Sequence, residues 1–177
     1  MIEGITIRNA EKEDVRQIAE ICVEDWKKAY RGIIDSDFLD SMSVDQRYGI
    51  EIKRYQDFIV AADADTILGY AWLQVTDDET ADCEIVALYV RYSCRKKGIG
   101  KLLLQEAVRR FRKLGRKRMI IWCLKENDES RGFYEKNGGK EFQTGSHNWG
   151  GREYGMISYL YDIGKGSSCP EDVRKKR

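Results

Sequence analysis

The chain has 177 residues, 42% of them hydrophobic and 34% charged, a composition typical of one soluble domain with a hydrophobic core. Its 31 Lys and Arg against 30 Asp and Glu give a net charge of +1, so no acidic partner is expected from the overall balance. The longest apolar runs are too short to cross a bilayer, and the first four residues lack the features of a signal peptide. We therefore expect neither a membrane protein nor a secreted one.

Cysteine and histidine are sparse. The cysteines are Cys22, Cys83, Cys94, Cys123 and Cys169. Their odd number, the lack of any CxxC pair and the presence of a single histidine, His147, argue against a disulfide framework or a zinc site. This pattern favours a reducing, cytoplasmic location and no bound metal.

The N-terminal third predicts one strand followed by two helices. Residues 5–8 alternate as a strand, and apolar residues then recur at three- and four-residue spacing until Gly32. The members of this helical face are Val15, Ile18, Ala19, Cys22, Trp26 and Tyr30. A second, shorter helix is expected after Ser43, through Ile52.

Three strands follow in succession. Residues 58–62 and 66–75 are rich in strand-forming residues and flank a turn at residues 63–65, and residues 83–90 form a nearly continuous apolar strand. Tight turns join sequential strands in an antiparallel arrangement, so these three should pair in that way.

A helix is predicted next, with apolar residues at helical spacing from Ile99 to Leu114 and a C-terminal cap at Gly115. Residues 118–124 then read as a buried strand. This helix should be a right-handed crossover between two parallel strands, which predicts an α/β (α+β) fold with a mixed sheet.

The C-terminal part predicts a short helix over residues 128–137 and two weaker strands, around residues 141–143 and 154–161. We expect one domain over residues 1–163 and a disordered polar tail over residues 164–177.

The loop RKKGIG, residues 95–100, lies between the predicted strand 83–90 and the helix that follows. A glycine-rich turn that leads into a helix exposes unpaired N–H groups and suits an anion. Leu103 replaces the third glycine of a dinucleotide-binding fingerprint. Arg95 and Leu102 break the P-loop pattern, so neither common phosphate motif applies.

Basic residues continue along the helix over residues 109–118, which leaves a nucleic-acid-binding module as an alternative. No aromatic interleaving or recognised nucleic-acid motif accompanies them. We therefore interpret them as a solvated basic face and expect no nucleic-acid partner.

Two motifs resemble the GNAT superfamily of N-acetyltransferases. Residues 95–100 match its pyrophosphate loop, [R/Q]-x-x-G-x-[G/A], and residues 127–138 are similar to its N-x-x-[A/S]-x-x-F-Y-E-K-x-G motif. Residues 26–34 also resemble the W-x-x-A-Y-x-G-I segment of one bacterial subgroup. The chain departs from the family at Tyr92, where proline is frequent, and at Gly139, where an aromatic residue is frequent.

The resemblance implies a GNAT fold with six to seven mostly antiparallel strands and about four helices, in which the fourth and fifth strands splay apart. It implies acetyl-CoA as the acyl donor, with the pyrophosphate on the loop and the pantetheine arm beside the fourth strand. The residues implicated in donor binding are Leu88, Tyr89, Val90, Arg95, Lys96, Lys97, Gly98, Ile99, Gly100, Lys101, Asn127, Ser130 and Tyr134.

Two residues are candidates for proton transfer. Tyr134 matches the motif's tyrosine, and a phenol that is protonated at neutral pH can donate to a leaving thiolate. Glu84 is a carboxylate within an apolar strand, a position that favours a general base, although some family members keep this glutamate for structural contacts. His147 is a weaker candidate.

The acceptor is less well defined. Trp26 and Tyr30 are interpreted as core residues, and Glu84 with Asp37, Asp40 and Asp45 weakly favours a cationic amine. The function predicted is transfer of an acetyl group to a primary amine of a small molecule or peptide, by direct attack in a ternary complex. The alternative is a catalytically silent acyl-CoA-binding or sensor domain. Family analogy also favours a homodimer.

Overall fold

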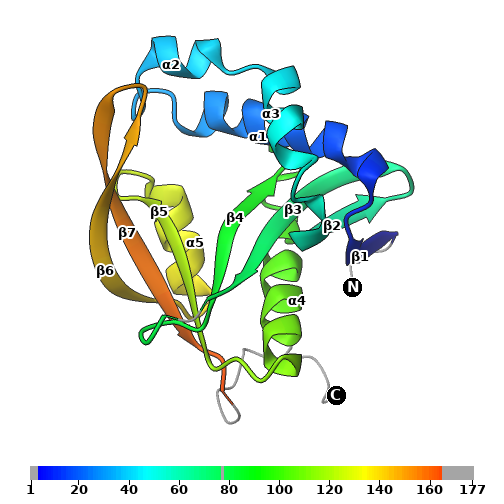
Figure 1. Ribbon diagram of the computed structural model, residues 1–177, viewed down its shortest axis with the longest axis vertical. Helices are drawn as coiled ribbons and strands as arrows, with labels where there is room; N and C mark the ends of the chain where they lie inside the picture. The colour runs from blue at the N-terminus through cyan, green and yellow to red at the C-terminus, as the bar shows by residue number, and fades with distance from the viewer. Residues whose placement is uncertain (1–3, 77, 165–177) are drawn as a thin grey trace.

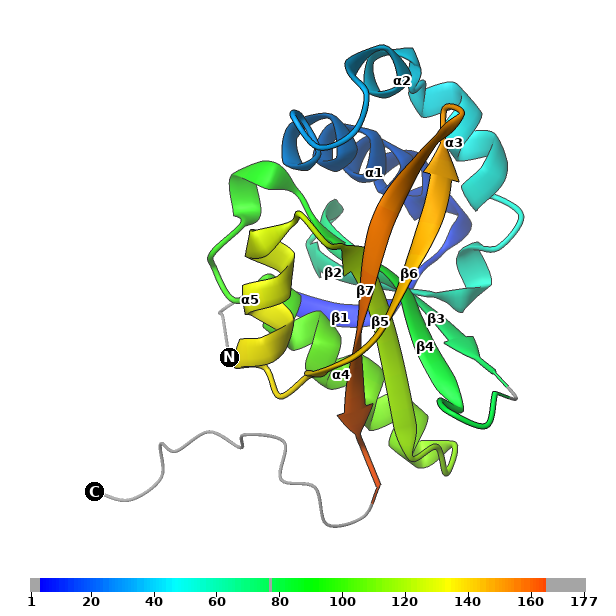
Figure 2. The same cartoon turned by 90° about the vertical axis from the view of Figure 1, so that its left-hand side faces the viewer.

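The computed structural model describes residues 4–76 and 78–164, and Figures 1 and 2 show it from two directions. Its helices and strands follow one another as β1 (Ile5–Asn9), α1 (Val15–Ala29), α2 (Ser36–Ser41), α3 (Val44–Glu51), β2 (Phe58–Asp63), β3 (Thr66–Val75), β4 (Cys83–Val90), α4 (Ile99–Lys113), β5 (Arg118–Leu124), α5 (Asp128–Lys136), β6 (Lys140–Trp149) and β7 (Arg152–Asp162). No helix within the described ranges is both long and apolar enough to cross a membrane. Apart from Gly164, the tail expected to be disordered lies outside the described residues.

The strands form one seven-stranded sheet in the order β1-β2-β3-β4-β5-β7-β6. Every neighbouring pair is antiparallel except β4 and β5, which run parallel. A parallel pair needs a long connection between its strands, and α4 lies in that connection. The predicted mixed sheet, its three sequential antiparallel strands and its parallel pair are confirmed.

Helices cover both faces of the sheet, and β2 shows how one strand serves both layers. Ile59 and Ala61 belong to the core under α4, whereas Phe58, Val60 and Ala62 pack in the core under α1. Successive side chains of a strand point to opposite faces, so a strand that is covered twice is apolar at nearly every position.

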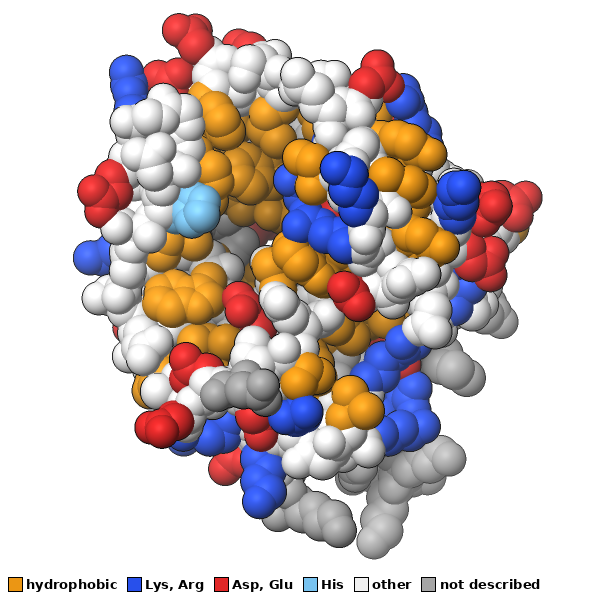
Figure 3. All heavy atoms as spheres, in the orientation of Figure 1, with side chains coloured by type: hydrophobic (Ala, Val, Ile, Leu, Met, Phe, Trp, Pro, Cys, Tyr) orange, Lys and Arg blue, Asp and Glu red, His pale blue; other side chains and the backbone are white. Residues whose placement is uncertain are grey.

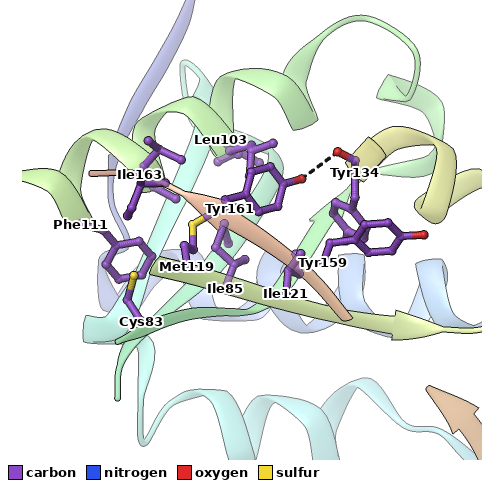
Figure 4. Packing of buried hydrophobic residues seen from close by; sticks show 14 of the residues in the cluster. Cys83, Ile85, Leu103, Phe111, Met119, Ile121, Tyr134, Tyr159, Tyr161 and Ile163 are labelled. Carbon is purple, nitrogen blue, oxygen red and sulfur yellow. Dashed lines mark hydrogen bonds between the residues drawn. The ribbon is translucent and has the colours of Figure 1, made fainter. Parts of the chain in front are cut away.

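The core on the α4 side joins the helix to the centre of the sheet. Leu103 and Phe111 from α4 are buried together with Cys83 and Ile85 from β4 and Met119 from β5 (Figure 4). The apolar stripe that predicted this helix is therefore its buried face. Packing of this face holds the start of α4 against the sheet near the end of β4.

The strands β4 and β5 separate after a short paired segment. Their register joins only Cys83, Glu84 and Ile85 to three residues of β5. A bulge opposite β3 follows at once, because Trp72 pairs with Ala87 while the next residue of β3 pairs with Ile85. A bulge increases the local twist, which turns the rest of β4 away from its neighbour. The splayed fourth and fifth strands are confirmed.

Other details differ from the sequence-based expectations. The structure has an additional helix, α2, whose first turn is capped by the side chain of Asp35, which accepts a hydrogen bond of 3.1 Å from the N–H of Phe38. Helix α1 ends at Ala29 rather than near Gly32. The late strands are longer than expected, since β6 has 10 residues and β7 has 11. The side chains of β6 are exposed, so its periodicity carries little burial signal.

Candidate active site

A cavity of about 610 Å³ opens where β4 and β5 separate. Its walls are residues 86–90 of β4, residues 121–123 of β5, the first turn of α4, helix α5 and the C-terminal part of α1. This volume is typical of a small-molecule site. Figure 3 shows that the face between the β6–β7 hairpin and α1–α3 is hollowed, with hydrophobic side chains around the hollow.

Most of the donor-binding residues predicted from the sequence meet at this cavity. Lys97 is the one that does not line it. The lining residues among them are Leu88, Tyr89, Val90, Arg95, Lys96, Gly98, Ile99, Gly100, Lys101, Asn127, Ser130 and Tyr134. Residues from three separate parts of the chain therefore surround one space.

The loop before α4 has an unusual backbone. Lys96 has a φ of 59° and Gly98 a φ of 84°, both in the left-handed region. A residue with a Cβ atom is strained at such a φ, so glycine is favoured at position 98. Gly98 is also the N-cap of α4, and it offers no side chain to satisfy the first N–H groups of the helix. The first turn contains no acidic residue, so these N–H groups form a site suited to an anion.

Arg95 is already engaged by two carboxylates. Its guanidinium donates one hydrogen bond to Asp25 on α1 and another, of 3.1 Å, to Glu129 on α5. The family resemblance implicates Arg95 in donor binding, and the residue lines the cavity. Its two terminal nitrogens bond to carboxylates on the neighbouring helices.

Asn127, implicated in donor binding by the family resemblance, caps α5. Its side-chain oxygen accepts a hydrogen bond of 3.1 Å from the N–H of Ser130, and the residue is buried at the cavity wall. Capping uses the amide oxygen, and the same side chain carries two N–H donors. The cap is therefore compatible with a second role in holding a ligand.

Tyr134 lies in the wall of the cavity and is only 6% exposed. Its ring contacts those of Phe133 and Tyr159, with centroids 5.4 and 5.6 Å away. Burial raises the pKa of its phenol well above the usual value of 10, because the charged phenolate is poorly solvated there. Tyr134 therefore keeps its proton at neutral pH.

Glu84 lies on β4 where that strand still pairs with both neighbours, opposite Gln74 and Ile120. It does not line the cavity, whose nearest wall residue along the strand is Val86. Burial raises the pKa of its carboxyl above the usual range. The structure thus brings Tyr134, but not Glu84, into the lining of the cavity.

Sequence reasoning missed two features of the cavity wall on α1. Asp25 is 4% exposed, and burial raises the pKa of its carboxyl to about 6, despite the opposing effect of Arg95. Tyr30 packs against the same hydrophobic cluster as Trp26, as interpreted from the sequence, but it also lines the cavity. The indole N–H of Trp26 donates a 2.9 Å hydrogen bond to the hydroxyl of Tyr89 on β4. The sequence offered one signal for Asp25, because it is an acidic residue within the predicted amphipathic helix.

The other acidic candidates lie elsewhere. Asp40 forms an ion pair of 2.7 Å with Arg31 and Asp45 one of 2.5 Å with Arg16, all with exposed side chains. Neither aspartate lines the cavity, nor does Asp37. None of the four acidic residues that favoured a cationic acceptor, Glu84 included, therefore lines the cavity.

His147 and the basic helix have ordinary surroundings. On the exposed strand β6, the ring centroids of His147 and Trp149 are 4.4 Å apart. Arg109 and Arg110 on α4 both pair with Glu106, at 2.6 and 2.7 Å, which offsets part of the positive charge there. Within residues 4–76 and 78–164, no three His, Cys, Asp or Glu residues are grouped so that they could hold a metal ion.

Comparison with known proteins gives a consistent result. The profile of the acetyltransferase (GNAT) family matches residues 15–139. A curated protein named spermidine N(1)-acetyltransferase, from Thermoplasma acidophilum, is 30% identical over 151 residues, which cover 80% of this chain and 91% of that protein.

Solved structures resemble the fold closely. The PaiA N-acetyltransferase of Thermoplasma acidophilum, in complex with coenzyme A, has a TM-score of 0.69 and 27% identity, covering 89% of this chain and 99% of that one. YncA from Salmonella typhimurium, solved with acetyl-CoA, has a TM-score of 0.68 and 18% identity, covering 96% and 100%. At that identity, the second likeness concerns the fold alone.

Proposed function

The chain belongs to the GNAT family of acetyltransferases and is an N-acetyltransferase. We propose that it transfers the acetyl group of acetyl-CoA to a primary amine of a small molecule or peptide. The amine attacks the thioester directly in a ternary complex. The proposal rests on the cavity between the separated parts of β4 and β5, which extends to the N-terminus of α4.

The donor occupies this cavity with its pyrophosphate on the loop before α4. The unpaired N–H groups of the first turn, together with the cations Lys96 and Lys101 in the wall, suit a phosphate-bearing ligand. The pantetheine arm lies along residues 86–90, whose edge is free of β5, and pairs with the main chain as an added strand would. Asn127 and Ser130 hold it from the opposite side.

The chemistry requires a polarised carbonyl and two proton transfers. The N–H of Val90 or a neighbour on β4 stabilises the oxyanion that forms when the amine nitrogen bonds to the thioester carbon. The carbon–sulfur bond then breaks, and Tyr134 gives its proton to the departing thiolate. Since Glu84 lies outside the cavity wall, it takes the amine proton through an intervening water rather than directly.

The acceptor approaches from the side of α1, where Tyr30 and Ala29 line the cavity. The similarity to a protein named spermidine N(1)-acetyltransferase makes spermidine the first amine to test. Aminoglycoside-like amines and a peptide with a free N-terminus complete the panel of cationic acceptors to test.

We also propose that the protein forms a homodimer through its late strands. Strand β6 lies at the edge of the sheet, and nine of its ten residues are exposed. An uncovered edge of this length can pair with another strand. Measuring the molar mass in solution by light scattering tests this, and a monomer at all concentrations would contradict it.

The decisive experiment combines acetyl-CoA with the panel of amines and follows the release of free CoA thiol. Initial rates measured against both substrates should give the intersecting pattern of a ternary complex. Parallel lines would indicate a covalent acetyl-enzyme and would overturn direct attack. The alternative, a silent acyl-CoA-binding domain, predicts saturable CoA binding with no thiol release for any amine.

A further inference from the structure

Asp25 and Arg95 form an ion pair inside the wall of the cavity. A terminal nitrogen of Arg95 donates to a carboxylate oxygen of Asp25, whose side chain is 5% exposed, while that of Arg95 is 22% exposed. Asp25 lies on α1, and Arg95 begins the loop that leads into α4. A carboxylate buried to this degree is costly unless it is paired, so the contact fixes both groups.

The same guanidinium reaches a third element. Its other terminal nitrogen donates to Glu129 in the first turn of α5, and its charged carbon lies 5.2 Å from the ring centre of Tyr92. A planar guanidinium with fixed donors can hold two carboxylates in a defined geometry, which an ammonium cannot do. Arg95 therefore connects α1, the loop and α5 at one point.

These three elements carry the groups that the proposed reaction uses. The loop presents the N–H groups of α4 to the donor phosphates. Asn127 caps α5, which bears Tyr134, and Tyr30 at the C-terminal end of α1 lines the cavity. A displacement of the loop relative to either helix would separate the donor from its acid and from the acceptor wall.

We propose that Asp25 is a positioning residue for the donor: through Arg95 it holds the pyrophosphate loop in place against α1 and α5. The inference rests on the proposed function, because it assumes acetyl-CoA in this cavity. Arg95 then acts as a structural connection rather than as a phosphate ligand, and Lys96 and Lys101 supply the cationic charge in the wall.

The effect of Asp25→Asn on the affinity for CoA distinguishes positioning from a simple effect of charge. Asp25 is a negative charge close to a site for phosphates, so its neutralisation in Asp25→Asn would strengthen CoA binding if charge alone mattered. If Asp25 positions the loop, the same substitution weakens binding, because Arg95 loses the partner that fixes it. A small misplacement of binding groups can reduce rates by about 10²-fold.

The test is calorimetric titration of the full chain with CoA, for the wild type, Asp25→Asn, Arg95→Gln and the double variant. We expect each single variant to bind about tenfold more weakly or worse, and the double variant to bind no worse than the weaker single one, since both remove the same connection. The matched control is Glu24→Gln, a carboxylate on α1 that pairs with Lys28 and does not line the cavity, and it should change the affinity much less. Binding by Asp25→Asn that equals or exceeds that of the wild type overturns the proposal.

A second measurement separates positioning from general destabilisation. The ratio of kcat/KM for acetyl-CoA to that for S-acetylpantetheine, which lacks the pyrophosphate, should fall in Asp25→Asn, whereas partial unfolding lowers both values equally. If Asp25→Asn does not fold, Arg95→Lys replaces it. That variant keeps the charge and should still lose affinity, and full retention of affinity would contradict the proposal. A wild type that neither binds CoA nor turns over would instead refute the proposed function.

Discussion

The side-chain hydroxyl of Tyr161 on β7 donates a 3.0 Å hydrogen bond to the main-chain carbonyl of Tyr134 on α5, inside the core shown in Figure 4. The same carbonyl accepts a 2.9 Å hydrogen bond from the N–H of Gly139. The end of the helix that carries the proposed general acid is therefore attached to the sheet by a tyrosine 27 residues further along the chain.

Replacing Tyr161 with phenylalanine should lower the free energy of unfolding by about 0.5–1.5 kcal/mol, the usual net value of one hydrogen bond. The loss should stay in this range because the carbonyl of Tyr134 keeps the N–H of Gly139 as a partner. Urea denaturation measures the change. A loss well above this range would mean that the hydroxyl supports more of the core than this one contact.

The close fit around Gly139 gives a second prediction. A Cβ atom at this position would lie 2.8 Å from the Cζ atom of Tyr161 and 3.0 Å from the carbonyl oxygen of Tyr134. Gly139→Ala should therefore destabilise the protein by about 1–3 kcal/mol through overpacking. The aromatic side chain found here in many GNAT sequences would need the space that Tyr161 occupies.

Gly49→Ala is the control for that substitution. Gly49 lies within α3, and a Cβ atom added there meets no atom within 4 Å. The control should raise the stability by about 0.4–1 kcal/mol, because alanine loses less backbone entropy on folding. If both variants changed stability in the same direction, the steric argument at Gly139 would be wrong.

Tyr134→Phe should reduce kcat by about 10²-fold or more and leave the affinity for CoA nearly unchanged, because only the proton of the phenol is lost. Steady-state kinetics with the best amine of the panel, combined with calorimetric titration of CoA, measure the two effects separately. Unchanged turnover would remove Tyr134 from the role of general acid.

Glu84 predicts a characteristic dependence on pH. A general base must be deprotonated, and burial raises the pKa of this carboxyl above its usual value of 4.5. The kcat/KM of the wild type should therefore fall as the pH drops through that raised pKa. Glu84→Gln should turn over slowly, and its kcat/KM should not show this fall at low pH. If the fall persists in the variant, another group is responsible for it.

The same pKa has a consequence for stability. A carboxyl whose pKa is raised on folding contributes stability that is present below the unfolded pKa and is lost as the pH rises through the folded value. Glu84→Gln should therefore be more stable than the wild type at pH 7, with the difference shrinking towards acidic pH. Urea denaturation at pH 7 and near pH 4.5 checks the sign.

The sequence alone determined the local features of this protein. Helical spacing and strand alternation report burial within one element, so they predicted the parallel strands 83–90 and 118–124 and the helix between them. The glycine-rich turn at residues 95–100 predicted an anion site, because glycine geometry and helix starts depend on neighbours in the chain. The resemblance of residues 95–100 and 127–138 to two GNAT motifs is what predicted a donor site there.

Contacts between distant residues became visible only in the folded structure. It paired Asp25 with Arg95 across 70 positions, brought Tyr30 into the cavity wall and left Glu84 outside it. It also produced the long, exposed strand β6, which has no burial pattern along the sequence. These features depend on desolvation and contacts between elements, and a periodicity confined to one element carries no information about either.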